Sequence, residues 1–417
     1  MTSSEKQTNV HHVDIAVALA PTILAAVPKL LEEMNADLTK LNEEDHEFRH
    51  QFLLKARLLV QSLETPRETM VKHTWAQTGA LAAIQLGVDT GLWSLMVQRG
   101  EQPQKIADLA STLGIETPLL SRLMRHLGAM GYVKEVGDDE YQTTNFTKAL
   151  SIPIIGDGYL PMLDGGGCAA LRFPSFSRKQ GWREPTDPDD TSFRYAYNES
   201  TNFFARQHAI GYGEKFNHHM GGYRQGRLPW MDPALYPVQE RLINGTDAGA
   251  DQPFIVDIGG SVGHDLVEFQ KYWPDHPGQL VLEDLEVVID QIKELSPSIK
   301  CVVYDFHTEQ PIKGARAYYI HSCLHDWPDK TCLSILGRIK EAMKPGYSKL
   351  LIHENVIPTR AAWWETTALD MVMLTFFSSR ERTQSDWENL MSQAGLNIVK
   401  IYSGGHGEES IIEVELL

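Results

Sequence analysis

Apolar residues recur at helical spacing through the first quarter of the chain. Residues 43–63 and 70–96 carry them three and four positions apart, which predicts two helices, the second largely buried. The apolar stretch 15–27 contains Pro21 and lacks the basic start of a secretory signal, so it is interpreted as an amphipathic or partner-packing helix. An opening this rich in apolar helix is typical of a segment that packs against a second subunit, and a homodimer is predicted.

A more specific pattern follows in residues 101–150. A short helix over 106–113 precedes a second helix that Thr117 caps and Gly131 ends, and a hairpin is predicted around residues 137–139. Helix, turn, helix and hairpin in this order indicate a winged helix. Residues 101–150 hold five Lys/Arg and seven Asp/Glu, so the basic footprint of a DNA reader is missing and a dimerisation role is favoured.

The middle of the chain is rich in Gly, Pro and aromatic residues. Residues 165–167 and 185–190 are predicted as loops, and residues 200–223 as partly helical. Several histidines lie there, but no acid or cysteine completes a ligand set at regular spacing, so no metal is predicted. An apolar substrate pocket is predicted instead, drawing also on a later apolar helix over 369–377. Its candidate residues are Phe203, His208, Tyr212, Met371 and Phe377.

Short apolar runs alternate with helical patterns after residue 250. Such runs are typical of buried parallel strands, and the intervening helices indicate βαβ units. The fold class is therefore α/β, a Rossmann-like doubly wound sheet preceded by a mostly helical winged-helix dimerisation domain. The predicted strands are 254–258, 279–282, 301–304, 317–320, 350–352, 398–402 and 411–416. The predicted divisions are a helical extension over 1–65, the winged-helix domain over 66–165, and a helical linker plus catalytic domain over 166–417.

Composition narrows the classes of partner. The chain has 38 Lys+Arg against 55 Asp+Glu, a formal charge of −17, which argues against nucleic acid as a ligand. No stretch approaches the roughly 20 apolar residues of a membrane span, so no membrane association is predicted. Four scattered cysteines without CxxC or zinc spacing fit a reducing, cytoplasmic location. They are Cys168, Cys301, Cys323 and Cys332.

The first predicted strand ends in the sequence VDIGGSVG, where glycines permit a tight turn and close approach of a ligand. Asp257 puts a carboxylate at the strand end, where a phosphate binder would want none. That favours a cationic, phosphate-free ligand such as S-adenosyl-L-methionine. Ser261 stands where a third glycine is usual. The candidate cofactor contacts of this turn are Asp257, Gly259, Gly260, Ser261 and Gly263.

Acids also close the second and third predicted strands. Asp284, followed by Leu285, is placed to bind both hydroxyls of a ribose. Asp305 and Phe306 are placed to meet the edge and the face of an adenine. A glycine turn combined with acids at the next two strand ends is a stronger indication of a nucleoside site than the turn alone.

The fourth predicted strand runs into the sequence HSCLHDWPD, and this places His325 just beyond its end, beside the cofactor site. A histidine there is a natural general base near neutral pH. Glu354 closes the fifth strand and Glu381 follows the later apolar helix. Two carboxylates would orient the imidazole and stabilise the imidazolium that forms.

The chain resembles the small-molecule O-methyltransferases of the caffeic acid and flavonoid type and their fungal secondary-metabolite relatives. The resemblance covers residues 70–417 and is concentrated in DIGGSVG, EDL, YDF, HDWPD, HEN and SRERT. It implies a class I methyltransferase domain and an S-adenosyl-L-methionine cofactor. It also implies an aromatic or polyketide-derived small-molecule substrate with a phenolic or enolic hydroxyl.

Residue by residue, the resemblance implies that His325 is the base and that Glu354 and Glu381 flank it, with Asp326 at the substrate edge. The implied cofactor contacts are Asp257, Gly259, Asp284, Asp305 and Trp327. His321 is a further candidate contact, at a place where family members often carry Lys or Arg.

Two other functions stay open. Some fungal relatives keep the cofactor and catalyse dehydrations or pericyclic ring closures; Ser261 and His321 leave room for this alternative, while the complete set of His325, Glu354 and Glu381 favours methyl transfer. A winged-helix regulator that senses a small ligand is the third interpretation. The acidic balance and the intact base set oppose it.

Overall fold

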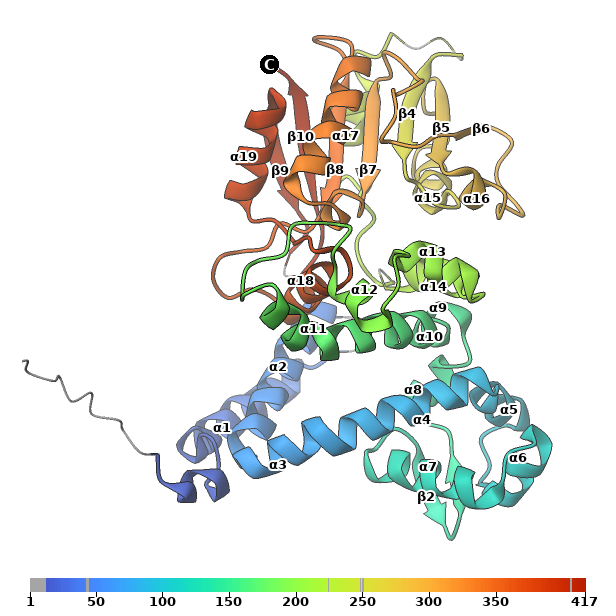
Figure 1. Cartoon of the computed structure of the whole chain (residues 1–417), viewed down its shortest axis with the longest axis vertical. Helices are drawn as coiled ribbons and strands as arrows, with labels where there is room; N and C mark the ends of the chain where they lie inside the picture. Colours follow the sequence, from blue (N-terminus) through green and yellow to red (C-terminus); the bar gives the residue numbers. More distant parts are fainter. Residues whose placement is uncertain (1–12, 43–44, 224, 248, 250, 406) are drawn as a thin grey trace, which may run out of the picture. The chain divides into compact units, whose positions relative to one another are not determined.

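The computed structural model describes residues 13–42, 45–223, 225–247, 249, 251–405 and 407–417, arranged in two compact units, residues 1–148 and 149–417. Residues 1–12, at the start of the predicted helical extension, lie outside the described residues. Each unit has its own buried apolar residues. Figure 1 labels the helices and strands of both units.

The first unit is mostly helical. Its longer helices are α1 (Val27–Asp37), α2 (His46–Leu63), α3 (Pro66–Val71), α4 (Gln77–Asp89), α5 (Leu92–Arg99), α6 (Ile106–Leu113) and α7 (Thr117–Ala129). The π-helical turn η4 (Lys72–Ala76) joins α3 to α4. The 3₁₀ turn η3 (Leu38–Lys40) follows α1. The helix predicted over 15–27 is wrong: the chain forms two separate 3₁₀ turns, η1 (Ile15–Leu19) and η2 (Leu24–Ala26), on either side of Pro21, which has no backbone N–H to donate.

The predicted hairpin is present in the first unit. Strands β2 (Lys134–Gly137) and β3 (Glu140–Gln142) pair antiparallel, and the short β1 (Gln104–Lys105) joins the other edge of β3. Glu116, rather than Thr117, is the N-cap residue of α7, and Pro118 lies in the first turn of this helix. Helices α4 and α5 of this unit pack closely, because a Cβ on Gly87 of α4 would lie 2.5 Å from the Trp93 ring of α5.

The second unit begins with helices that precede the sheet. They are α9 (Pro153–Gly156), α10 (Tyr159–Met162), α11 (Cys168–Lys179), α12 (Ser192–Tyr197), α13 (Phe203–Ala209) and α14 (Gly213–Gly222), with the π-helical turn η6 (Gln239–Ile243) further on. The short helix α8 (Asn145–Ala149) comes before them, with residues 145–148 in the first unit. The loop predicted at 165–167 is wrong, because these glycines lie in the π-helical turn η5 (Leu163–Gly167) that connects α10 to α11. Their missing side chains let other helices approach: a Cβ on Gly165 would lie 2.6 Å from Phe203, and one on Gly166 would lie 3.0 Å from Phe376.

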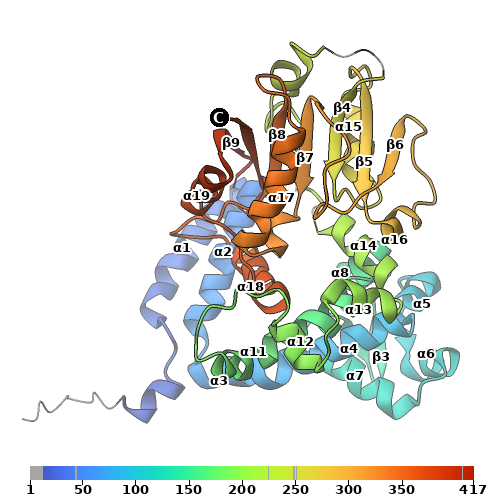
Figure 2. The same cartoon turned by 45° about the horizontal axis from the view of Figure 1, so that its top comes forward.

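A seven-stranded sheet forms the centre of the second unit, in the order β6-β5-β4-β7-β8-β10-β9 (Figure 2). The first five strands in this order are parallel, and β10 and β9 are antiparallel additions. All seven predicted strands are present. They are β4 (Pro253–Ile258), β5 (Gln279–Asp284), β6 (Ile299–Val303), β7 (Ala317–His321), β8 (Lys349–Glu354), β9 (Leu396–Ser403) and β10 (Ser410–Leu416).

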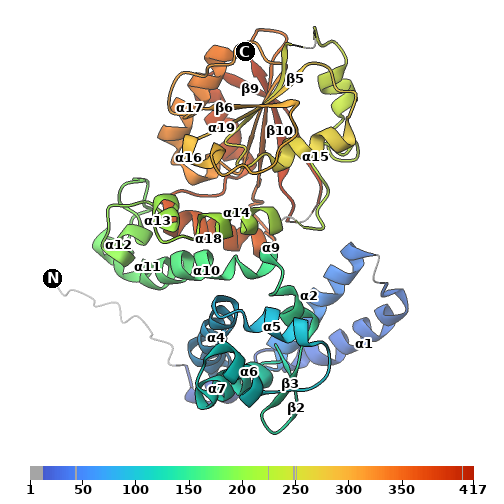
Figure 3. The ribbon, with the colours of Figure 1, turned by 90° about the vertical axis from the view of Figure 1, so that its right-hand side faces the viewer.

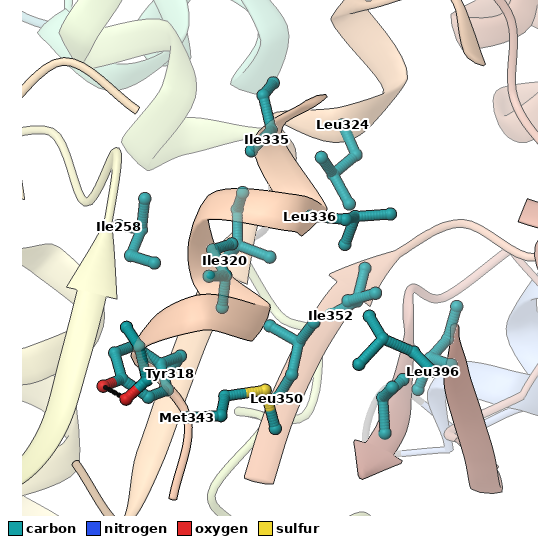
Figure 4. Packing of buried hydrophobic residues seen from close by; sticks show 14 of the residues in the cluster. Ile258, Tyr318, Ile320, Leu324, Ile335, Leu336, Met343, Leu350, Ile352 and Leu396 are labelled. Atoms are coloured by element: carbon teal, nitrogen blue, oxygen red, sulfur yellow. Dashed lines mark hydrogen bonds between the residues drawn. The ribbon is translucent and has the colours of Figure 1, made fainter. Parts of the chain in front are cut away.

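Helices cover both faces of this sheet (Figure 3). Alternate strand residues such as Val256, Ile320 and Ile352 pack against α17 (Asp329–Ala342) and α19 (Gln384–Ala394). Figure 4 shows Ile320 and Ile352 of the sheet beside Ile335 and Leu336 of α17. The opposite face packs against α15 (His264–Tyr272) and residues 228–243. The remaining helices are α16 (Glu286–Ile289), the 3₁₀ turn η7 (Leu324–Asp326) and α18 (Trp364–Phe377). Because both faces are covered, the carboxyl ends of the parallel strands are where a ligand can reach the sheet.

No single helix of the described residues has the length and apolar character that a membrane crossing requires. One bent pair, Pro66–Asp89 with Leu92–Arg99, meets these criteria only when its two parts are taken together across a 68° bend.

Candidate active site

The turn after β4 folds tightly back on the sheet. The amides of Gly259 and Gly260 both donate to the carbonyl of Glu283, at 2.8 and 3.2 Å. Gly259 has φ +71°, and a Cβ on Gly260 would lie 2.5 Å from the Asp257 carboxyl carbon, so larger residues would not fit at either position. Gly263, with φ +88°, begins α15. Ser261 adopts φ +56°, which a non-glycine residue rarely does, and its amide donates to Asp284 Oδ2 at 2.8 Å.

Asp257 is fully buried at the end of β4. Neither of its carboxylate oxygens has a hydrogen-bond partner among the residues that the structure describes. Burial, together with the nearby Asp265, raises the pKa of Asp257 well above its usual range. A cationic ligand group would offset that burial and favour the ionised carboxylate, which is the complementarity that S-adenosyl-L-methionine requires. The turn therefore fits such a cofactor.

Asp284 closes β5 with both oxygens held by the backbone. Oδ2 accepts from Ser261, and Oδ1 accepts from the amide of Leu285 at 2.7 Å. Burial raises the pKa of Asp284 to about 6, although the two amides act to lower it. The carboxylate is thus oriented beside the glycine turn, where a strand-end acid can bind ribose hydroxyls. The side chain of Leu285 is largely exposed.

The end of β6 adds aromatic surfaces. Asp305 is exposed and accepts from the amide of His307 at 2.9 Å. The rings of Phe306 and Trp327 meet edge to face with centroids 6.3 Å apart, and His307 lies 4.8 Å from Trp327. The structure therefore groups Phe306 with Trp327, two of the residues predicted to contact the cofactor.

His325 sits on the three-residue turn η7 that follows β7, and it is buried. One carboxylate oxygen, Glu354 Oε1, accepts from three consecutive amides of this turn. The donors are Cys323 at 3.0 Å, Leu324 at 2.8 Å and His325 at 3.3 Å. Glu354, at the end of β8, thereby holds the backbone that carries the histidine.

Three acids surround the His325 imidazole. Nδ1 lies 2.8 Å from Glu381 Oε1 and 3.4 Å from Glu354 Oε2, and Nε2 lies 3.6 Å from Asp326 Oδ1. Burial acts to lower the pKa of His325, but Glu354, Glu381 and Asp326 outweigh it and hold the pKa well above its usual range. Burial raises the pKa of Asp326 to about 7. An ionised carboxylate only accepts, so the geometry assigns the Nδ1 proton to the Glu381 hydrogen bond.

The histidine turn and the glycine turn touch through Cys323. A Cβ on Gly259 would lie 2.8 Å from the Cys323 sulfur, which itself lies 3.9 Å from the carbonyls of Ile258 and Gly259. Two residues further along the chain comes His325. The structure thus brings the predicted base and the predicted cofactor turn to one end of the sheet.

A second polar cluster surrounds His321 at the end of β7. His321 Nδ1 lies 2.6 Å from Asp265 Oδ2 on α15, and Nε2 lies 3.4 Å from Glu409 Oε1. Glu409 also accepts from Ser322 Oγ at 2.8 Å and from the Tyr223 hydroxyl at 3.0 Å. His321 is therefore engaged by side chains of this chain. Asp265, Glu409 and Tyr223 were missed by the sequence analysis, since nothing in their local sequence indicates that they meet.

Two groups of side chains offer metal-ligand atoms within 4.8 Å of one another, namely His321, His353 and Glu409, and His325, Glu354 and Glu381. One ring nitrogen of each histidine in these groups lies within hydrogen-bond distance of a side-chain oxygen. His353 Nδ1 pairs with the Tyr319 hydroxyl at 2.7 Å, and its ring stacks on His321 with centroids 4.2 Å apart.

The predicted pocket residues are only partly brought together. Phe203 and Phe377 pack with ring centroids 6.1 Å apart, and Phe376 lies 4.6 Å from Phe203. Met371 is 49 % exposed on α18, and His208 is exposed on α13. Tyr212, half-buried, is the N-cap residue of α14. An aromatic cluster of α13, α14 and α18 therefore exists, with the Phe203 ring in its interior.

The O-methyltransferase domain family matches residues 238–397. O-methyltransferase mpaG of Penicillium brevicompactum is 33 % identical over 402 residues, which cover 94 % of this chain and 99 % of that protein. OxaC, solved in complex with sinefungin and meleagrin, has a TM-score of 0.84 at 27 % identity over 94 % of this chain and 99 % of OxaC. A solved structure described as a pericyclic reaction enzyme has a TM-score of 0.83 at 26 % identity, covering 94 % of this chain and 100 % of that enzyme.

Proposed function

Because the chain belongs to the O-methyltransferase family, we propose that it methylates a phenolic or enolic hydroxyl of a small aromatic or polyketide-derived secondary metabolite, with His325 as general base. The observation that carries this proposal is the buried pairing of His325 Nδ1 with Glu381, at 2.8 Å, on a turn that touches the glycine turn. The match to methyltransferases, and to OxaC with sinefungin bound, supports S-adenosyl-L-methionine as cofactor.

The residues proposed to hold that cofactor lie at the ends of neighbouring strands and in the turns that follow them. They are Asp257, Gly259, Gly260, Ser261, Gly263, Asp284, Leu285, Asp305, Phe306, His321 and Trp327. When bound, it supplies a sulfonium methyl group and leaves as S-adenosylhomocysteine. The buried Asp257 matches a positive charge, and the fixed Asp284 matches a pair of hydroxyls.

His325 then acts on the acceptor. Nε2 takes the hydroxyl proton as the oxygen forms its new bond to carbon, and the imidazolium that results is stabilised by Glu381 and Glu354. Asp326, beside Nε2, is proposed to face the acceptor. Because the carboxylates hold the pKa of His325 high, the base is more fully available above neutral pH.

The test is an assay with methyl-labelled S-adenosyl-L-methionine and a panel of phenolic and enolic acceptors. His325→Ala is compared with the wild type, and His46→Ala, an exposed histidine of α2, is the matched control. Label in an organic product that disappears only with His325→Ala supports the proposal. Undiminished labelling in His325→Ala would contradict the role of the base.

A pericyclic or dehydration reaction that keeps the cofactor is the second candidate, favoured by the likeness to the pericyclic reaction enzyme. Consumption of an acceptor to an isomer or a dehydrated product, without S-adenosylhomocysteine, would support it over methyl transfer.

We also propose that the first unit contains most of a winged-helix domain over residues 66–165 and, together with the preceding helical extension, forms a homodimer. Its helices expose a series of apolar side chains that a second copy could cover. These are Leu31, Leu53, Leu58, Val60, Leu63, Met70 and Trp75. Sedimentation equilibrium should give twice the chain mass for the wild type and a lighter species for Met70→Glu combined with Trp75→Glu. Leu171→Glu, at an exposed apolar residue of the second unit, is the control. A wild type that sediments as a monomer would contradict the proposal.

A further inference from the structure

One buried arginine holds the carbonyl end of the turn that carries His325. Arg382 is 1 % exposed and follows Glu381 directly. Its Nη1 donates to the carbonyl of Leu324 at 3.0 Å, and its Nη2 donates to the carbonyl of Trp327 at 2.8 Å. These two carbonyls lie on either side of His325 in the chain. The guanidinium therefore binds the backbone of the turn both before and after the proposed base.

The arginine is itself fixed on its other sides. Nε and Nη2 donate to Asp329 Oδ1 at 2.9 and 2.8 Å, and the guanidinium carbon lies 5.2 Å from the centre of the Trp387 ring. The Arg382 carbonyl accepts from the amide of Ile357 at 3.0 Å, which ties the segment to the chain that follows β8. A side chain bound on this many sides has little freedom to move, so Arg382 fixes the position of the two carbonyls that it binds.

The turn is thus held at both ends by opposite charges. Glu354 accepts from the amides of residues 323–325, and Arg382 donates to the carbonyls of residues 324 and 327. The Leu324 carbonyl also accepts from the Trp327 amide, at 3.2 Å, within the turn. A short turn leaves its first amides without backbone partners, and a charged side chain satisfies them strongly. The neighbouring Glu381 meanwhile binds the His325 ring. Two adjacent residues of one loop therefore bind the turn: Arg382 binds backbone carbonyls on either side of His325, and Glu381 binds the ring of His325.

We propose that Arg382 is a positioning residue of the reaction, which sets His325 and Trp327 relative to the cofactor turn through the carbonyls of Leu324 and Trp327. It contacts no reacting atom. This inference rests on the proposed function, because it takes His325 as the base. The planar guanidinium spans two carbonyls and a carboxylate at once, and a lysine ammonium at the same place could not.

The test compares Arg382→Lys with Arg380→Lys. Arg380 also pairs with Asp329, at 3.2 Å, but its side chain is 39 % exposed and no described contact joins it to the histidine turn. With Arg382→Lys we expect kcat to fall by about 10- to 100-fold, since small misplacement of a reacting group has effects of that size. The KM for the acceptor should change much less, and Arg380→Lys should stay within about twofold of the wild type.

A second readout does not depend on turnover. The pH titration of the His325 ring is followed by NMR, with the resonance assigned by its absence in His325→Ala. In Arg382→Lys the turn moves away from Glu381, so the pKa of His325 should fall toward its usual value. A purely structural arginine would lower thermal stability while leaving this titration, and kcat per folded molecule, as in the wild type.

A folded Arg382→Lys protein with wild-type kcat and wild-type titration of His325 would overturn the proposal. If Arg382→Lys does not fold, Asp329→Asn replaces it, since that side chain is 45 % exposed and anchors the same guanidinium. It should shift kcat and the titration in the same direction by less, and unchanged values would again overturn the proposal. Failure of the proposed function would give a different result, namely full methyl transfer by His325→Ala or no methyl transfer by the wild type. In that case the pH titration of the His325 ring in Arg382→Lys still decides whether Arg382 positions His325.

Discussion

Asp257 and Glu381 are both buried acids of the second unit with a histidine nearby, but only Glu381 forms a hydrogen bond to its histidine. Neither oxygen of Asp257 has a hydrogen-bond partner in the described part of the chain, whereas Glu381 Oε1 lies 2.8 Å from His325 Nδ1. Burial raises the pKa of both acids, and His325 opposes that rise at Glu381 by both charge and hydrogen bond. Asp257 is therefore complementary to a positive charge on a ligand, whereas the charge of Glu381 is compensated by His325 of the same unit. The two ends of the site should therefore respond differently to the same kind of substitution.

The largest effect is expected at the catalytic end. His325→Ala should lower kcat by about 10²- to 10⁴-fold, the usual contribution of a general base. The affinity for S-adenosylhomocysteine, measured by calorimetry, should stay near the wild-type value, because Asp257 and Asp284 are untouched. A large loss of that affinity would mean that the two ends of the site are not separable.

Asp257→Asn tests the other end. Removing the charge should weaken the binding of S-adenosyl-L-methionine by about 10- to 100-fold, the range for hydrogen bonds to charged groups. The ligand-free protein should melt at a higher temperature, because an unpartnered buried acid is lost. Asp275→Asn, at an exposed acid after α15, should change neither quantity. Unchanged affinity in Asp257→Asn would remove this carboxylate from the cofactor site.

Glu381→Gln sharpens the contrast through pH. Glu354 and Glu381 hold the pKa of His325 above its usual range, so wild-type kcat/KM should rise with pH on a limb that lies above pH 6.5. With Gln at residue 381 one of these charges is gone, the pKa of His325 falls, and the limb should move to lower pH while maximal kcat decreases. A limb at the same pH in both proteins would contradict the assignment of this titration to His325.

The smallest effect concerns stability. Burial raises the pKa of Asp284 to about 6, so the folded protein binds a proton there more readily than the unfolded chain does. The free energy of unfolding should consequently fall as pH rises from about 4 to about 6, by the linkage of proton binding to folding. Asp284→Asn should flatten this part of the curve in urea titrations at several pH values. An equal slope in wild type and variant would show that Asp284 is not the group that titrates.

The strands could be predicted because buried parallel strands are continuous apolar runs, and all seven runs became strands. The predicted catalytic set could be named because each residue sits at a strand end or in a short motif. The short helical turns were harder to predict from the sequence than the strands. The glycines at 165–167 were predicted as a loop, but Phe203 and Phe376 pack against them in a π-helical turn, a contact that no local pattern records.

Arg382 illustrates the same limit within a recognised motif. Its neighbour Glu381 was singled out as a carboxylate near a histidine, and the only available signal for Arg382 was that adjacency. A charged residue in a charged run is usually solvated, so its burial against the carbonyls of Leu324 and Trp327 could not be read from the run itself.

The amino-acid sequence by itself determined the sheet, the glycine turn and the acids that end its strands, because period, turn chemistry and strand ends are local properties. Tertiary structure decided which groups partner which. It left Asp257 without a hydrogen bond from the described residues, engaged His321 with Asp265 and Glu409, and placed Glu354 and Arg382 at opposite ends of one turn. These pairings join residues 29 to 88 positions apart, and only the packing of the whole unit brings such residues within hydrogen-bond distance.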